Sequence, residues 1–266
     1  MALFPEIEHK VYNYTFLLNT FTALHFAQRT EADCDEALMH RLEEFLQDSF
    51  QAPNTRPPYP SQEIFLQRGD GQVDFLLTDR HAMVRVGRKV YRTFGASLLP
   101  EASKLRRFVF DVLQLNSVSR IEVRKISLFP MDVPGISPIA KNVTPLLSQI
   151  LSQNVMSLMK VGEVSEIEGS VAPFTHHVMT DVASGYRYDI LLGLMLDPAR
   201  GINACNAILD VTCSYGNNDG ISSDDIERRQ VDMNKTVYDF YHWAVRDHVI
   251  DVMQRKEENN ESGTNQ

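Results

Sequence analysis

Residues 206–253 constrain the fold more than any other stretch, because a strand pattern, a turn pattern and a helix pattern follow one another directly there. Between Ala207 and Ser214, apolar residues alternate with mixed ones at the two-residue period of a half-buried strand. The Gly-Asn-Asn-Asp-Gly cluster at 216–220 permits positive φ and predicts that the strand ends there. We therefore expect a helix shortly after the strand, with the upstream chain packed against it.

The predicted helix has a recognisable start and one broad apolar face. Ser222 precedes Asp225 by three positions, which resembles a capping box, and acidic residues in the first turn complement the positive end of the helix dipole. Apolar residues then recur every three or four positions as far as about Gln254, and no Gly or Pro interrupts them. These residues are Met233, Val237, Phe240, Tyr241, Ala244, Val245, Val249 and Val252. The pattern predicts a single long amphipathic helix.

Upstream of this stretch, helices and strands are predicted in an order that occurs twice. The expected strands are 19–29, 64–67, 72–78, 83–94, 118–129, 174–182, 186–196 and 203–214, and the expected helices are 30–50, 98–115 and 144–153. A helix continuing from Tyr12 competes with the first strand, and residues 154–169 hold at most a short strand at 161–167. No residue-level identity links the halves, so a repeat and a coincidence of element order both stay open.

Together the elements predict an α+β fold. In this interpretation one domain spans residues 1–255, and its antiparallel sheets are built from two β-α-β-β-β-α halves at about 1–116 and 117–255. Helices are expected to pack on one face of the sheets. Residues 256–266 are polar and lack apolar anchors, so this tail is expected to be disordered.

Charge and cysteine content restrict the possible environment and partners. A net charge of -9 argues against broad nonspecific binding to nucleic acid, which needs Lys and Arg to replace phosphate counterions, although a local basic patch stays open. No apolar run is long enough to span a bilayer, and residues 1–10 lack the order of a signal peptide. Cys34 stands apart, and Cys205 and Cys213 lie too far apart on one predicted strand for a disulfide. We expect a cytoplasmic protein.

The sharpest group of charged residues is Arg120, Glu122 and Arg124, which alternate with Ile121 and Val123 and so share one face of a predicted strand. A guanidinium fork suits planar acidic groups, so this row could grip an anion or a carboxylate. The alternative is a solvent-facing, salt-bridged row that Glu122 helps to neutralise.

Asp210 lies between apolar residues of another predicted strand, where aspartate is disfavoured and needs a partner. It could neutralise the arginines of the charged row or belong to a binding site with them. Arg120, Arg124 and Asp210 are therefore the predicted binding residues.

The histidines give little support for a metal site. His176 and His177 are adjacent on a predicted strand and point to opposite faces, and His242 and His248 lie roughly 240° apart around a helix. The sequence contains no HExxH, CxxC, GxSxG or Walker-type glycine loop. We therefore predict no catalytic residues, no metal and no cofactor, and we favour a non-catalytic protein over an enzyme.

Three segments resemble a sporadically distributed prokaryotic family of uncharacterised proteins that is known by a number only. The segments are SRIEVRKISLFP, AILDVT and NKTVYDFYHWAVRD, and they would place the arginine-containing strand of the family at Arg120 and Arg124, its Asp at Asp210 and its helical aromatic at Phe240 or Tyr241. Asn234 departs from the family, whose helix commonly carries His there. The resemblance implies the element order and no established activity.

Two hypotheses of different class follow. The preferred one is a non-catalytic accessory or chaperone-like protein that binds another protein, or itself, through a sheet face, a sheet edge or the last helix. The alternative is a metal-dependent hydrolase or nuclease that uses His177, Asp181 and Asp210. Single-strand RNA binding around Arg120, Arg124 and Tyr186 is a minor option, and the negative net charge counts against it.

Self-association is also expected, because the last predicted helix is richer in aromatic residues than one buried stripe requires. A dimer contact is predicted at its aromatic positions, which are Tyr238, Phe240, Tyr241 and Trp243.

Overall fold

The computed structural model describes residues 3–8, 12, 15–29, 36–50, 64–68, 73–87, 98–132, 143–159, 174–197, 199–201 and 204–255. In chain order the elements are β1 (Leu17–His25), α1 (Glu36–Phe50), β2 (Ile64–Arg68), β3 (Val73–Leu77), β4 (His81–Gly87), α2 (Leu98–Arg107), the π-helical turn η3 (Phe108–Val112), β5 (Val118–Asp132), α3 (Val143–Ile150), α4 (Gln153–Met159), β6 (Phe174–Asp181), β7 (Tyr186–Leu196), β8 (Ala204–Ile221), α5 (Ser223–Ala244) and α6 (Asp247–Arg255). The short strand expected at 161–167, the tail at 256–266 and Cys34 lie outside the described residues.

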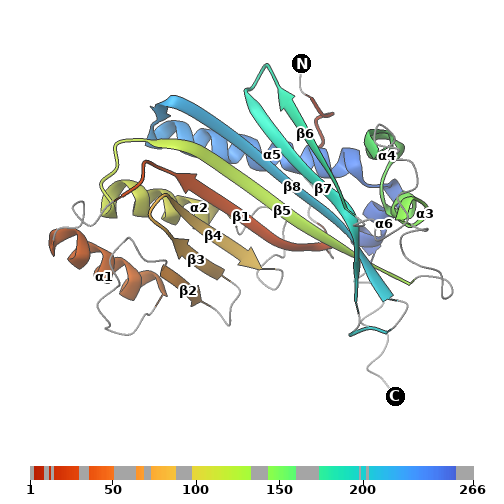
Figure 1. Cartoon of the computed structure of the whole chain (residues 1–266), viewed down its shortest axis with the longest axis horizontal. Helices are drawn as coiled ribbons and strands as arrows, with labels where there is room; N and C mark the ends of the chain where they lie inside the picture. Colours follow the sequence, from red (N-terminus) through yellow and green to blue (C-terminus); the bar gives the residue numbers. More distant parts are fainter. Residues whose placement is uncertain are drawn as a thin grey trace, which may run out of the picture. The chain divides into compact units, whose positions relative to one another are not determined.

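The fold is α+β, as predicted. Eight strands form an antiparallel sheet in the order β2-β3-β4-β1-β5-β8-β7-β6 (Figure 1). Both halves of the chain follow the order strand, helix, three strands and helix, with α3 and α4 at the place of the first helix in the second half. An origin by repetition of one unit stays a prediction.

The chain separates into two compact units. Unit 1 comprises Met1–Leu18, Lys125–Thr212 and Thr236–Gln266, and unit 2 comprises Asn19–Arg124 and Cys213–Lys235. The boundaries fall inside β1, β5, β8 and α5. The prediction of a single domain over residues 1–255 stays a prediction, and each unit is described by itself below.

Unit 2 is built on the pairing of β1 with β4, and this pairing decides whether the first predicted element is a strand or a helix. Leu24 and Thr22 are fully buried on one side of β1, whereas Phe21 and His25 are only half-buried on the other. β4 and β3 continue the sheet in antiparallel register. The strand interpretation of residues 19–25 is therefore confirmed over the competing helix, because the side chains alternate between the two faces.

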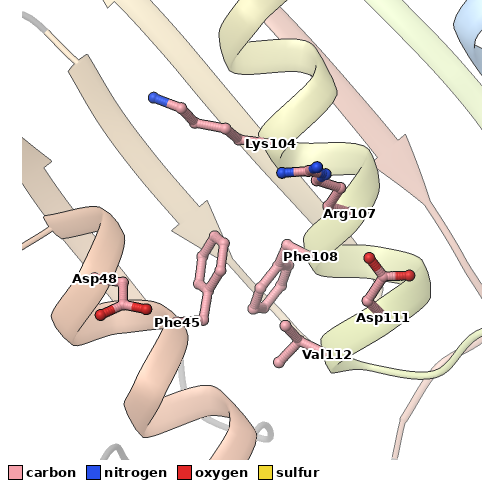
Figure 2. A pocket seen from close by; sticks show the side chains of 7 residues that line it. All are labelled: Phe45, Asp48, Lys104, Arg107, Phe108, Asp111 and Val112. Carbon is pink, nitrogen blue, oxygen red and sulfur yellow. The ribbon is translucent and has the colours of Figure 1, made fainter.

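Helix α1 and the turn η3 cover the buried face of these strands with aromatic rings. Phe75 of β3 meets Phe108 edge to face with 5.0 Å between ring centroids, and Phe45 of α1 lies 4.6 Å from Phe108 (Figure 2). From α5, the Gln230 amide donates to the Thr22 hydroxyl over 2.9 Å and so satisfies a buried polar group of β1. The core of unit 2 lies between these helices and the sheet.

The strand β8 does not end at the Gly-Asn-Asp cluster, and the prediction of a loop there was wrong. β8 continues through it to Ile221. Gly220 has φ +89° and faces Ser117, the hydroxyl of which would lie 2.5 Å from a Cβ atom. Asn217 and Asp219 hydrogen-bond within the segment itself. The glycine therefore allows a close approach of neighbouring chain instead of a turn.

The last helix is also interrupted, contrary to the single helix predicted. It begins as expected, because the Ser222 hydroxyl accepts from the backbone N–H of Asp225. It then breaks after Ala244, where the backbone of residues 150–152 competes for its hydrogen bonds. Ser152 N–H donates to the Ala244 carbonyl over 2.8 Å, and Arg246 N–H donates to the Ile150 carbonyl over 2.9 Å. These bonds replace helical ones, so α5 and α6 are separate helices.

In unit 1 the N-terminal segment covers the aromatic residues of α5. Phe4 is buried, and its ring lies 5.1 Å from that of Phe240 and 5.4 Å from that of Trp243. The hydroxyl of Tyr12 lies 2.7 Å from Nε2 of His242. The aromatic excess that suggested a dimer contact is therefore packed within the chain itself, and self-association stays a prediction.

We predict that Gly220→Ala destabilises the protein by more than about 1 kcal/mol, because alanine is strained at positive φ and its Cβ would collide with Ser117. Gly216→Ala is the matched control, since its nearest neighbour would be the Ser119 carbonyl oxygen at 3.6 Å, an ordinary contact. The urea midpoint of each variant measures the difference. Equal midpoints for the two variants would contradict the close approach at Gly220.

Candidate binding face of unit 2

The charged row predicted on one strand face is present on β5. Ile121 and Val123 are completely buried, while Arg120 and Arg124 are exposed and Glu122 is half-buried. The three charged residues therefore share the face opposite the helices.

Each arginine of the row already has a neighbour. Nη2 of Arg120 lies 2.7 Å from Oε1 of Glu122, so the salt-bridged interpretation is correct for this pair. The guanidinium of Arg124 lies 5.4 Å from the centroid of the Phe21 ring on the adjacent strand β1, within the range of a cation–π interaction. The arginine side chains are thus held in place but remain accessible, and 44% of the Arg120 side-chain surface is exposed.

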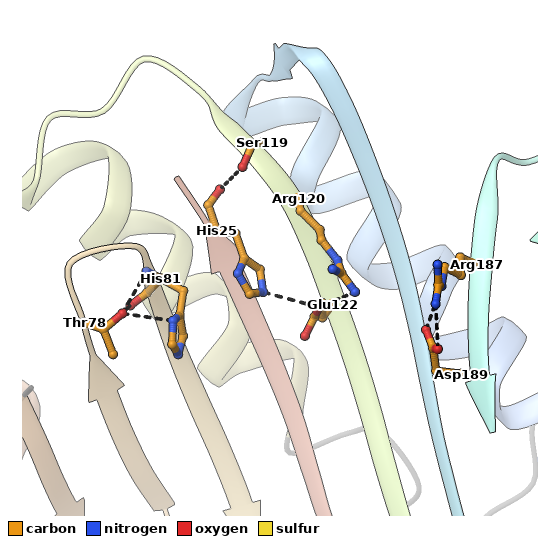
Figure 3. Close-up of polar contacts among 8 residues, drawn as sticks. All are labelled: His25, Thr78, His81, Ser119, Arg120, Glu122, Arg187 and Asp189. Carbon is orange, nitrogen blue, oxygen red and sulfur yellow. Dashed lines mark hydrogen bonds and ion pairs between the residues drawn. The ribbon is translucent and has the colours of Figure 1, made fainter. Parts of the chain in front are cut away.

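Two histidines complete the group, and the sequence analysis missed them. His25 and His81 are direct partners in the β1–β4 register, and their rings stack with 5.3 Å between centroids. Nε2 of His25 lies 3.4 Å from Oε1 of Glu122 (Figure 3). The Thr78 hydroxyl lies 2.9 Å from Nδ1 of His81. No local pattern reveals this pair, because its register joins strands that are far apart in sequence.

The electrostatic state of Glu122 follows from these neighbours. Burial alone would raise the pKa of the Glu122 carboxyl, because it disfavours the charged form. The hydrogen bond and charge of His25 and the charges of Arg120 and His81 outweigh burial and hold the pKa below the ordinary value. Glu122 is therefore ionised at neutral pH and joins the arginine to the histidines.

The same face extends to β4 and β3. Arg85 stands opposite Asp74 in the strand register, its Nε lies 2.5 Å from Oδ2 of Asp74, and its Nη1 donates to the Asn19 amide oxygen over 3.1 Å. We call the set Arg85, Arg120, Arg124, His25, His81, Glu122 and Phe21 the arginine–histidine face. Two of its arginines lie against carboxylates, Arg85 against Asp74 and Arg120 against Glu122.

Asp210 has a different setting. It belongs to β8 within unit 1, and only 7% of its surface is exposed. The structure therefore does not present Asp210 as an accessible group for a partner, and its part in binding stays a prediction.

Asp181 and His177, which were predicted for a metal-dependent hydrolase or nuclease, lie on β6 in unit 1. Asp181 accepts from the backbone N–H of Ala183 and from the Ser184 hydroxyl at the β6–β7 hairpin, and the Ser184 hydrogen bond is the largest cause of its lowered pKa. His177 is half-buried, and burial lowers the pKa of its imidazole. Within the described ranges, no group of three or more His, Cys, Asp and Glu side chains could hold a metal ion.

Other predicted residues are placed as follows. His176 is exposed and lies 3.2 Å from Asp189, whereas the adjacent His177 belongs to the other face of β6, as the alternation predicts. Tyr186, the aromatic residue of the RNA hypothesis, is buried at 3% exposure, so its ring is not available to stack on a base. Cys205 and Cys213 are buried and form no disulfide in the part of the chain that is described.

Comparison with known proteins does not assign the chain to a family. No protein-family model matches the chain, and no curated protein is similar to it. The resemblance to the prokaryotic family therefore stays a prediction. No helix within the described residues is both long and apolar enough to cross a membrane.

We predict that Glu122→Gln lowers the free energy of unfolding by less than about 1 kcal/mol at near-neutral pH. The pKa of Glu122 is lowered from 4.5 by folding, so its stabilising contribution is present above that value and is lost as the pH falls through the lowered pKa. Urea unfolding at near-neutral and at strongly acidic pH measures this. The difference in free energy of unfolding between wild type and Glu122→Gln should disappear in acid. Glu44→Gln, which removes a charge from an exposed pair on α1, should show a smaller difference at both pH values. A gap that widens in acid would contradict the assignment.

Proposed function

We propose that this protein is a non-catalytic binding protein that holds an acidic segment of another protein on its arginine–histidine face. The observation that carries the proposal is the exposed row Arg120 and Arg124 on a sheet face of a chain with a net charge of -9. Positive groups gathered in one place on an acidic chain favour a negatively charged partner, because complementary charges speed encounter and fix orientation.

The chemistry of the face supports a carboxylate-bearing peptide. A guanidinium group offers a planar fork of donors that matches a carboxylate. Arg120 is anchored by Glu122 and Arg124 lies over Phe21, so both side chains lose less conformational freedom when a partner binds. The ring of Phe21 lies on the same face and adds apolar surface beside the charges.

The proposal includes an accessory or chaperone-like role in the cytoplasm of a prokaryotic cell. Buried thiols that are not linked, at Cys205 and Cys213, are typical of a reducing compartment. The metal-dependent alternative has no specific observation in its favour, since the described residues offer no metal-binding group.

The test compares charge reversal on this face with the same change elsewhere. Arg120→Glu/Arg124→Glu reverses both charges of the row, Arg120→Glu alone reverses one of them, and Arg187→Glu is the control matched to the single variant. Arg187 is exposed on a strand and pairs with Asp189 two positions away, as Arg120 pairs with Glu122. Tagged versions are used to purify partners from the native cell, and the captured proteins are quantified by mass spectrometry. Binding of the purified partner is then measured across salt concentrations.

We expect a partner with an acidic segment that binds wild type and Arg187→Glu equally. The double variant should bind it at least about tenfold more weakly, and rising salt should weaken the wild-type complex. A partner that binds the double variant as tightly as wild type would overturn the proposal. Phosphodiester hydrolysis with zinc or manganese that is lost in His177→Ala and Asp181→Ala would also overturn it, in favour of the hydrolase.

A further inference from the structure

A second feature of unit 2 is a pocket between α1 and the segment formed by α2 and η3. Its volume is about 330 Å³. The lining residues are Phe45, Asp48, Lys104, Arg107, Phe108, Asp111 and Val112 (Figure 2). This volume lies at the lower end of the range for small-molecule sites, so only a compact ligand fits.

The floor of the pocket is aromatic and rigid. Phe108 is completely buried, and the Phe45 ring packs against it with 4.6 Å between centroids and a tilt of 42°. Val112 extends the apolar surface by one helical turn. The half-buried Phe45 and Val112 offer this apolar surface to a ligand, and the Phe45 ring favours an aromatic group, because aromatic pairs gain energy beyond the area that they bury.

The wall that carries Phe108 is a π-helical turn. The N–H of Leu113 donates to the carbonyl of Phe108 over 3.0 Å, five residues back, and Nε of Arg41 on α1 donates to the carbonyl of Val112 over 3.1 Å. The second bond ties α1 directly to the turn. Turns of this kind cost stability and are found frequently at functional sites.

Charges of opposite sign stand on the two sides of the aromatic floor. Figure 2 shows Asp48 on α1 on one side of the two rings and Arg107 on α2 on the other. Lys104 pairs with Glu101 at 3.0 Å. Within the ranges that the structure describes, Asp48, Arg107 and Asp111 form no hydrogen bond or ion pair.

We propose that this pocket binds a free aromatic amino acid. The ring of the ligand lies on the half-buried Phe45 and Val112, its carboxylate meets Arg107, and its ammonium group meets Asp48. A zwitterion can meet Arg107 and Asp48 at once, whereas a simple anion or a simple cation can meet only one of the two. This site uses neither Arg120 nor Arg124 and is independent of the proposed protein-binding face.

The experiment uses isothermal titration calorimetry on the full chain with four probes. They are L-phenylalanine, 3-phenylpropionate, phenethylamine and L-alanine, which separate the contributions of the carboxylate, the ammonium group and the ring. We expect saturable binding of L-phenylalanine and binding roughly tenfold or more weaker for each of the other three.

Three variants locate the site. Asp48→Asn and Arg107→Gln should each weaken L-phenylalanine roughly tenfold or more, whereas Glu44→Gln removes one charge from α1 outside the pocket and should leave the affinity unchanged. Urea midpoints confirm that the variants are folded. No saturable binding of L-phenylalanine at concentrations on the order of 10 mM would overturn the proposal, and so would equal binding by the Asp48 and Arg107 variants or equal affinity for all four probes.

Discussion

The structure of unit 2 depends on the alternation of side chains between the two faces of its strands. In β5 the residues Ile121 and Val123 are completely buried, which leaves their charged neighbours no place except the opposite face. A slip of one residue would put two arginines into an apolar core, and the cost of burying such charges fixes the register. The pairing of β1 with β4 brings His25 to His81, and Nε2 of His25 lies 3.4 Å from Oε1 of Glu122.

On that face, each of the two carboxylates lies against positively charged side chains, which reduces the repulsion among the positive groups. Glu122 lies between an arginine and a histidine, and Asp74 lies against Arg85, so each carboxylate is opposed by positive charge. Arg120 and Arg124 nevertheless remain exposed on a chain of net charge -9. An acidic partner would complete the pattern by replacing water with carboxylates at side chains that are already oriented.

Features set by local sequence could be predicted, and features set by distant contacts could not. The row on β5 needed only the two-residue period of a strand. The His25–His81 pair needs the β1–β4 register, and the break after Ala244 needs backbone donors and acceptors from residues 150–152. The glycines near residue 220 were misinterpreted because a turn and a close approach of neighbouring chain use the same residue type. The pocket beside η3 depends on how two separate helices pack.

Single cysteines at positions 120 to 124 test the central claim most directly, through the rate at which each reacts with a thiol reagent in the folded protein, followed by peptide mass spectrometry. Cysteines in place of Arg120, Glu122 and Arg124 should react rapidly, and those in place of Ile121 and Val123 should react slowly until the protein is unfolded. Uniform rates at all five positions, or fast reaction at 121 and 123 only, would contradict a β5 strand that presents its charges to a partner.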